Sequence, residues 1–339
     1  MDQRAVKPKR PPTRRRRLRG IIKLALLGLG ALMATGLVYQ WIGAAVDARR
    51  YPPPGRLVDV NGYPMHIYCV GEGSPTVVLD TLSGGISSYW GWVQPEVAGF
   101  TRVCAYDRAG RAWSGAAPAS GLAQSVENLH MLLVSAGESP PYVMAGHSIG
   151  GLYALLFATA YPQEIGGIVF VDASHPAQQA RYPELAESAR AFTARARFLP
   201  WLARIGIARL YFDLGGKLDM GDLPPQSFAE AASWWSSAAY FESLLDEIGL
   251  SEANFAYANA VHRDLGDLPI AVVTAGSEAF DGWRQLQDEL AVLSTNSLHM
   301  VVSEADHASL VFDPVHARKT AAAILQVVAA ARDGGPVAR

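Results

Sequence analysis

The sequence predicts an α/β protein with a mostly parallel sheet, preceded by one transmembrane helix at the N-terminus. Three observations support this prediction. Short apolar runs, of the kind that form buried strands, alternate with stretches of helical periodicity. Helical segments alone interrupt this alternation from residue 176 to residue 266, and an uncharged stretch, 24–46, precedes the whole pattern. With 339 residues, half of them apolar, the chain is long enough to bury a full core.

The first 46 residues combine a basic segment with an apolar one. Residues 1–23 contain ten lysines and arginines and one acid, a net charge of +9, so the rest of the chain carries −11. As a helix, residues 24–46 would be about 35 Å long, enough to cross a bilayer core of about 30 Å. Because basic segments stay on the cytoplasmic side, we expect a single-pass anchor with a cytoplasmic N-terminus and the following domain outside. Tyr39 and Trp41 suit the outer interface.

Two other interpretations of this segment compete with the anchor. Small residues at Ala44, Ala45 and Ala48 are compatible with a cleaved signal sequence, although the apolar region of such signals is usually shorter, about 7–15 residues. The basic run alone would suit a nucleic acid, but the charge of −11 on the remaining chain argues against such a partner. Residues 47–55 include three consecutive prolines, and we predict an extended linker that holds the domain away from the membrane surface.

The elements of the domain follow from local patterns. Asn61-Gly62 is a strong hairpin turn signal between the first two predicted strands, 55–60 and 64–70. Further strands are predicted at 76–80, 102–106, 142–145, 167–171, 268–275 and 299–303, and helices at 88–97, 122–136, 151–160, 282–293 and 314–331. The helical insertion 176–266 is rich in alanine and aromatic residues, and we expect it to form a lid over the site. A helical layer packed elsewhere is the alternative.

One serine stands between two glycines where a predicted strand meets a predicted helix, in GHSIGG at 146–151. A turn this sharp strains the backbone of the serine, and glycine two positions away on either side avoids collisions. This context is typical of a nucleophile elbow, which exposes the hydroxyl of Ser148 above the sheet at the start of a helix. The sequence therefore predicts that Ser148 is a catalytic nucleophile.

A serine hydroxyl is a weak nucleophile and needs a base. Among the eight histidines, His307 lies between the last predicted strand and the last predicted helix. In the chain order serine, acid, histidine, this is the position of the base. The other histidines fall inside predicted elements, on the elbow itself or beside the insertion. We therefore expect His307 to be the base.

Residues 56–333 resemble the α/β-hydrolase family. The resemblance rests on YDRAG at 106–110, after the fourth predicted strand, and on GHSIGG at 146–151, after the fifth. It implies an eight-stranded, mostly parallel α/β-hydrolase sheet, with the helical insertion placed as a cap after the sixth strand. It also implies that the strands carrying Cys69 and Cys104 are neighbours, so a disulfide and two buried thiols both remain open.

The resemblance places the acid after either the seventh or the sixth strand. The turn after the seventh strand reads GSEAFD at 276–281, with alanine where the family usually has aspartate. After the sixth strand, Asp172 ends a buried run, where a carboxylate without a partner would be costly to bury. We therefore expect Asp172 to be the catalytic acid, with Glu278 as the alternative and Asp281 behind it.

Two backbone amides are expected to hold the oxyanion. The first belongs to Ile149, the residue after the nucleophile. The second should come from the loop after the third strand, where the family typically has His-Gly. This chain has DTLSGG at 80–85, with Thr81-Leu82 in place of His-Gly, and matching the end of the strand puts Ser83 at the donor position.

Together these expectations describe a membrane-anchored serine hydrolase that cleaves a carboxylic ester or related acyl substrate through an acyl-enzyme. The aromatic cap suggests an apolar, small-molecule acyl substrate, and the N-terminal helix implies contact with membrane lipid. Peptidase, thioesterase and carbon–carbon hydrolase chemistry stay open, as does a catalytically silent binding module of the same fold. The sequence has no metal-binding or cofactor-binding motif, and we expect neither a metal nor a cofactor.

Overall fold

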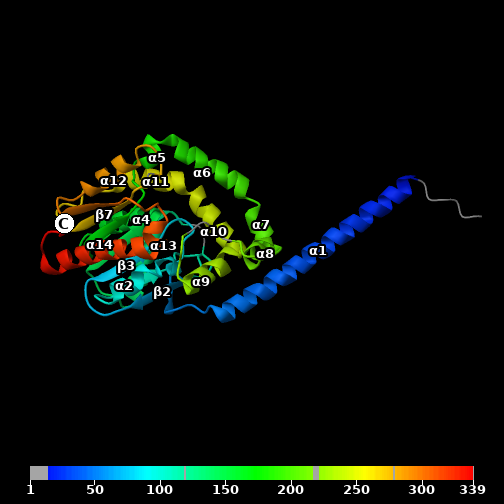
Figure 1. The fold of residues 1–339 in the computed structure, drawn as a ribbon, viewed down its shortest axis with the longest axis horizontal. Helices are drawn as coiled ribbons and strands as arrows, with labels where there is room; N and C mark the ends of the chain where they lie inside the picture. The colour runs from blue at the N-terminus through cyan, green and yellow to red at the C-terminus, as the bar shows by residue number, and fades with distance from the viewer. Residues whose placement is uncertain (1–13, 118–119, 217–220, 278, 339) are drawn as a thin grey trace, which may run out of the picture.

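The computed structural model describes residues 14–117, 120–216, 221–277 and 279–338. Its centre is an eight-stranded sheet in the order β1-β2-β4-β3-β5-β6-β7-β8 (Figure 1). Strand β2 runs antiparallel to both of its neighbours, and every other pair is parallel. The sheet is therefore mostly parallel, as the sequence predicts. The strands are β1 (Arg56–Val60), β2 (Tyr63–Val70), β3 (Thr76–Asp80), β4 (Val103–Tyr106), β5 (Tyr142–His147), β6 (Ile165–Val171), β7 (Ile270–Ala275) and β8 (Ser297–Val302).

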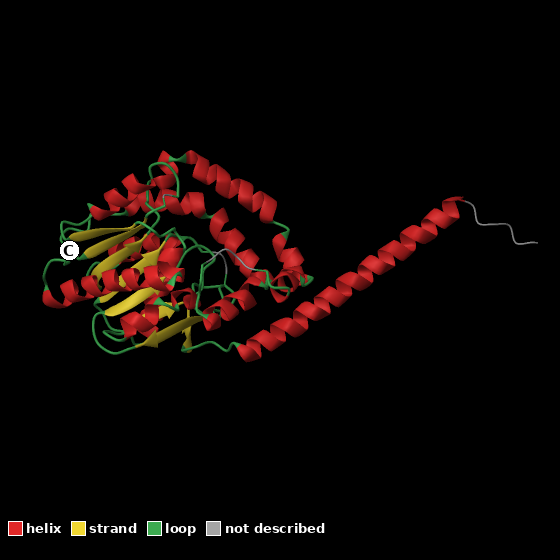
Figure 2. Cartoon of the chain, viewed as in Figure 1, coloured by secondary structure: helices red, strands yellow, loops and turns green. Residues whose placement is uncertain are grey.

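Helices cover both faces of the sheet (Figure 2). The covering elements are η1 (Ser87–Trp90), α2 (Val93–Ala98), α3 (Leu122–Ser135), α4 (Ile149–Ala160), α12 (Trp283–Ala291), α13 (Ser309–Phe312) and α14 (Pro314–Asp333). Alternate residues of a strand point to opposite faces, so on β3 Val78 packs with α3 and α4, while Val77 and Leu79 pack with α2 and α14. Strands β3, β5 and β7 are buried at every residue, which explains their continuous apolar sequences.

The insertion between β6 and β7 forms a helical cap. Its described helices are α5 (Gln178–Arg181), α6 (Pro183–Ala196), α7 (Leu199–Arg204), α8 (Ile207–Asp213), α9 (Pro225–Trp235), α10 (Ala238–Gly249) and α11 (Ser251–Val261). Trp235 fixes the cap to the sheet domain, because its fully buried indole packs on Tyr89 and donates a 2.8 Å hydrogen bond to the Tyr89 hydroxyl. The cap therefore belongs to the same packed body as the sheet.

The N-terminal helix α1 (Arg14–Arg50) projects from this body as a long rod (Figure 1). Within the described residues, the part of α1 from Leu18 to Arg50 is long enough and apolar enough to cross a membrane. The helix continues through residues 47–50, which the sequence assigned to the linker. Asp47 is paired there with Arg209 of α8 at 2.7 Å, and Pro52 then disfavours further helix. The end of α1 thus lies against the cap, instead of being separated from it by an extended spacer.

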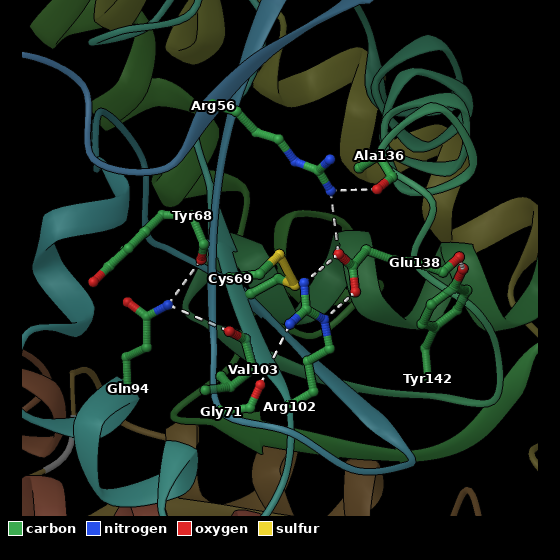
Figure 3. The surroundings of a disulfide bond; sticks show 11 residues. Arg56, Tyr68, Cys69, Gly71, Gln94, Arg102, Val103, Ala136, Glu138 and Tyr142 are labelled. Atoms are coloured by element: carbon green, nitrogen blue, oxygen red, sulfur yellow. Dashed lines mark hydrogen bonds and ion pairs between the residues drawn. A yellow bond between two sulfur atoms is a disulfide. The ribbon is translucent and has the colours of Figure 1, made fainter.

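A disulfide joins β2 to β4. Cys69 and Cys104 are directly opposite each other in the strand register and are bonded in the structure. Beside them, Arg102 binds the buried carboxylate of Glu138 through two hydrogen bonds of 2.6 and 2.7 Å (Figure 3). Of the two alternatives left open by the sequence, the structure therefore contains the disulfide.

Candidate active site

Ser148 lies at the sharp turn from β5 into α4. Its φ of 58° and ψ of −123° are strained for a residue with a side chain. A Cβ added to Gly146 would lie 2.2 Å from the carbonyl oxygen of Gly150, and one added to Gly150 would lie 2.6 Å from that of Asp80. The two glycines are therefore required by the close approach of the backbone, and the turn has the geometry of a nucleophile elbow.

Asp172 follows β6 directly and is fully buried. Its Oδ2 accepts a 2.6 Å hydrogen bond from Nδ1 of His307, while Oδ1 accepts bonds from Nε1 of Trp283 at 2.9 Å and the amide of Ala275 at 3.1 Å. Burial alone would raise the pKa of Asp172, but these donors, with His307 the strongest, outweigh burial and lower that pKa. The carboxylate is therefore held ionised next to the imidazole.

His307 lies between β8 and α13, and two contacts fix it. Its Nδ1 is bonded to Asp172, which leaves Nε2 as the nitrogen that can accept a proton. Its backbone carbonyl accepts a 2.8 Å hydrogen bond from Nε2 of His147. Burial lowers the pKa of His147 to about 3, so that ring stays neutral and acts as a donor to the loop of His307.

Two of the predicted catalytic residues, Ser148 and Asp172, follow adjacent strands of the sheet. Strand β5 pairs with β6 up to His147 opposite Val171, so Ser148 and Asp172 are the next residues on adjacent strands. The amide of Ser148 donates to the carbonyl of Val171 at 3.1 Å. The alternative acid Glu278 lies outside the described residues, and Asp281 is exposed. The structure thus brings Asp172, rather than Asp281, to His307.

A cavity of about 370 Å³ lies between the elbow and the cap. Ser148, Ile149 and Ser83, the predicted nucleophile and the two predicted oxyanion donors, all line it. Its cap side is formed by residues of α5, α6, α10 and α11, including Phe192 and Glu247. The two residues whose amides are expected to bind an oxyanion therefore line the same cavity as the serine.

The loop that carries Ser83 is fixed by a buried arginine. Arg108 pairs with Asp80 at 2.5 Å through Nη1, and its two terminal nitrogens also donate to the carbonyl oxygens of Thr81 at 3.0 Å and Leu82 at 2.8 Å. These are the two residues that replace the expected His-Gly. The arginine thereby holds the loop backbone that the replacement left in doubt.

A buried glutamate of the cap completes this cluster. Glu247 of α10 accepts a 3.0 Å hydrogen bond from the amide of Gly84 and pairs with Arg111 at 2.8 Å and with Arg108 at 3.2 Å. Burial would raise the pKa of Glu247, but Arg111 and Arg108 reverse the effect and lower it. Glu247 therefore ties the cap to the loop that carries Ser83.

Sequence reasoning did not assign roles to Trp283, His147 or Glu247. Trp283 and Glu247 lie in helices far along the chain from their partners, and no local pattern marks them. His147 lies on the elbow itself, and its bond to the His307 carbonyl shows what it contacts. Among the described residues, one group of three potential metal ligands occurs, Cys69, Cys104 and Glu138, and its two sulfurs are already bonded to each other.

A parallel sheet that presents a serine at such a turn, with an acid and a histidine following later strands, defines a class of hydrolytic enzymes. The chain belongs to the alpha/beta hydrolase family, because residues 77–323 match the model of that family. The resemblance noted from the sequence is thus confirmed.

Two curated relatives are uncharacterized proteins. One, from Schizosaccharomyces pombe, is 30% identical over 223 residues, which are 63% of this chain and 39% of that protein. The other, from Bacillus subtilis, is 27% identical over 169 residues, 48% of this chain and 52% of that protein. The chain therefore spans between about two fifths and about half of the length of these relatives.

Solved structures of hydrolases share the fold. The enol-lactonase of Burkholderia xenovorans LB400 superimposes with a TM-score of 0.57 at 16% identity, covering 80% of this chain and 98% of that one. An epoxide hydrolase of Bacillus megaterium superimposes with a TM-score of 0.60 at 18% identity, covering 80% of this chain and 99% of that one. At these identities the likeness shows the fold alone.

Proposed function

We propose that this protein is a membrane-anchored serine hydrolase that cleaves a carboxylic ester or a related acyl substrate. The observation that carries the proposal is the 2.6 Å hydrogen bond between His307 and Asp172. Asp172 follows β6, and β6 pairs with β5, the strand that directly precedes Ser148. With Nδ1 engaged by the acid, Nε2 is the nitrogen that can serve as the base. Serine, histidine and acid then occupy the roles of a catalytic triad.

In the proposed reaction, Ser148 attacks the acyl carbonyl while Nε2 of His307 takes the hydroxyl proton. The carboxylate of Asp172 stabilises the imidazolium and keeps its orientation. The imidazolium then gives its proton to the leaving alcohol, and an acyl-enzyme remains. A water molecule, deprotonated by the same nitrogen, attacks the acyl-enzyme and releases the carboxylic acid and Ser148.

The amides of Ile149 and Ser83 are proposed to hold the oxyanion. Ile149 begins α4, so its amide belongs to the first turn of that helix, where the helix dipole favours negative charge. The Ser83 loop is held by Arg108 and Glu247, which reduces the reorganisation needed when charge develops. Both residues line the cavity with Ser148.

The helix α1 is proposed to anchor the protein in a membrane. Its apolar length supports a single span, and the basic residues before it support a cytoplasmic N-terminus with the catalytic domain on the extracytoplasmic side. The Cys69–Cys104 disulfide agrees with an oxidising compartment. The partners of the protein are then membrane lipid and an apolar, small-molecule acyl substrate, with no nucleic acid. An alkaline phosphatase fused to the C-terminus should be active, and an inactive fusion would contradict this orientation.

Fluorophosphonate labelling tests the catalytic part of the proposal. Full-length protein in detergent should be labelled, and Ser148→Ala should not, while Ser174→Ala, which changes another serine lining the cavity, keeps the label. An unlabelled wild type, beside a labelled control hydrolase, would favour a catalytically silent binding module. If labelling succeeds, turnover of esters, thioesters, peptides and carbon–carbon substrates then separates the remaining acyl chemistries.

A further inference from the structure

At the end of the cap where α7 and α8 lie next to α1 (Figure 1), exposed apolar side chains form a surface. We call it the cap patch. It consists of six side chains on α7, on α8 and at their ends, between 39% and 78% exposed: Phe198, Trp201, Leu202, Ile207, Leu210 and Leu214. Exposed apolar residues scattered singly are normal, but a group of this kind on two consecutive short helices marks an interaction surface.

The helix α1 packs directly against α7 and α8, and the contact is close. A Cβ added to Gly36 would lie 2.3 Å from the carbonyl oxygen of Ile205, and one added to Gly206 would lie 2.7 Å from the ring of Tyr39. The Tyr39 hydroxyl also donates to the carboxylate of Asp213. The small residues therefore let the two backbones approach, and a polar contact fixes their register.

Further along α1, the contact with the cap becomes polar. Nε of Arg209 donates to the side chain of Gln40 at 3.0 Å, and its Nη1 pairs with Asp47 at 2.7 Å. The amide of Gln40 in turn donates to the carbonyl of Ser236 at 3.0 Å. Arg209 is buried in this contact. The position of the cap on α1 is thus defined by the chain itself.

The length of α1 then sets the depth of α7 and α8. At about 1.5 Å per residue, Gly36 lies about 18 Å along the helix from Leu24 and about 27 Å from Leu18, where the apolar span begins. A bilayer core is about 30 Å thick. Whether the core begins at Leu24 or at Leu18, Gly36 is within the outer leaflet or near its boundary. The cap helices that contact Gly36 are therefore brought to the outer leaflet, about 3 Å below its boundary if the core begins at Leu18 and about 12 Å below it if the core begins at Leu24.

The cap patch is also connected along the chain to a wall of the cavity. The cavity is lined on its cap side by Ser188, Ala189 and Phe192 of α6, and α6 leads into α7 at Leu199. Phe192 is itself 41% exposed. One run of chain therefore connects the apolar surface to the space above Ser148.

We propose that the cap patch is a membrane-binding surface that lies in the outer lipid–water interface of the bilayer that holds α1, and that the enzyme takes an acyl substrate dissolved in that bilayer. This inference rests on the proposed anchoring and hydrolysis. Amphipathic helices at an interface bury their apolar side chains by about 5–10 Å, and aromatic residues such as Trp201 favour the headgroup level. The occupant we propose is lipid rather than another protein, because α7 and α8 pack against the apolar helix α1.

Spin labels on single cysteines in full-length protein, reconstituted in phosphatidylcholine nanodiscs, test the position of the surface. The native cysteines are in a disulfide, so the label goes to the introduced thiol. Trp201→Cys and Leu210→Cys report the cap patch, Leu29→Cys reports the span, and Val292→Cys, 79% exposed on the sheet domain, is the aqueous control. In power-saturation measurements, labels on the cap patch and on the span should collide often with oxygen and rarely with the nickel chelate. The label at position 292 should show the reverse.

The outcomes separate the two proposals. If Leu29 lies in lipid while positions 201 and 210 collide freely with the nickel chelate, the cap patch is not at the interface and the anchor stands. If Leu29 is also aqueous, the anchor is wrong, and the surface that rests on it is wrong as well. Labels at 201 and 210 that are shielded from both reagents would indicate a protein contact and would overturn the proposal.

Hydrolysis by variants tests the delivery of substrate. We expect the double substitution Trp201→Ser with Leu210→Ser to leave hydrolysis of a water-soluble butyrate ester within about twofold. It should lower hydrolysis of a palmitate ester embedded in the nanodisc by at least about tenfold, because two large side chains no longer bury apolar surface in lipid. Val292→Ser should change neither rate. Equal losses on both esters would show a general effect on the enzyme and would overturn the delivery role.

Discussion

Asp172 and His307 are 135 residues apart in the chain, and the Oδ2 of one lies 2.6 Å from the Nδ1 of the other. The pair forms where β6 and β8 end on the same side of the sheet, with β7 between them. Trp283 and the amide of Ala275 occupy the second carboxylate oxygen, so the carboxylate has a single orientation. This relationship defines which nitrogen of His307 can act as a base.

Asp172→Asn should lower kcat by about 10³- to 10⁴-fold, because an amide no longer selects the tautomer of His307 or stabilises its charge. The measurement is steady-state hydrolysis of a soluble ester by protein whose folding is checked by circular dichroism. Asp281→Asn, at an exposed aspartate of the turn after β7, is the matched control and should keep full activity. If Asp172→Asn remains active while Glu278→Gln does not, the acid has been assigned to the wrong carboxylate.

Gly150→Ala should abolish most activity, with a loss of at least about 100-fold. The added methyl group would lie 2.6 Å from the carbonyl oxygen of Asp80, so β3 or the elbow must move, and misplaced catalytic groups are costly. Gly249→Ala is the control, because the space around that glycine is open. Full ester turnover by Gly150→Ala would show that the close approach of the elbow to β3 is not needed.

Glu247→Ala should lower the free energy of unfolding by about 3–5 kcal/mol, because it leaves two buried arginines without their shared partner. The control lies on the same helix: Glu242 is exposed and paired with Arg204, and Glu242→Ala should cost no more than about 1 kcal/mol. Denaturant unfolding of the detergent-solubilised protein gives both values. Equal values for the two variants would show that the buried cluster adds no stability.

Glu247→Gln separates stability from catalysis. The glutamine keeps an oxygen for the amide of Gly84 but removes the charge that holds Arg108 and Arg111. We expect kcat for a soluble ester to fall by about tenfold or more with little change in KM, because the loop of Ser83 supports the transition state more than substrate binding. A change confined to KM would assign Glu247 to substrate contact instead.

Stability should depend on pH through His147. Its pKa falls to about 3 in the folded protein, so between about pH 6.5 and pH 3 the unfolded chain binds a proton at this site that the folded protein does not. Acidification through this range therefore destabilises the fold by about 1.4 kcal/mol per pH unit for this group. His147→Gln should reduce the slope of unfolding free energy against pH, measured between pH 6.5 and 5, by about 1.4 kcal/mol per pH unit, the equivalent of about one proton. An unchanged slope would contradict a neutral, buried His147.

Local patterns predicted the features that depend on local sequence. The strands were found because β3, β5 and β7 are buried at every residue and therefore read as unbroken apolar runs. The elbow was found because its two glycines are required by backbone contacts within and beside the turn. The pairing of Asp172 with His307 was predicted from the family resemblance, which offers the end of the sixth strand as a position for the acid, and from the cost of burying a carboxylate without a partner.

The contacts that local patterns missed join helices to distant loops. Glu247 lies 163 residues from Gly84, and a glutamate in an amphipathic helix gives no sign that it will be buried between two arginines. The contact of α1 with the cap was also missed. From its sequence, the apolar part of α1 was expected to contact lipid. The structure shows that Gly36 and Gly43 of this helix instead contact Ile205 and Arg209 of the cap.

If the domain lies on the extracytoplasmic side, as proposed, the bond between Cys69 and Cys104 makes completion of the fold depend on translocation. The cytosol keeps cysteines reduced, so a chain that stalls before export would lack the crosslink between β2 and β4. The two cysteines are 35 residues apart in the sequence. Such a crosslink is worth about 4 kcal/mol for a loop of this length. A chain retained inside the cell would then be the less stable one, and quality-control proteases would remove it first.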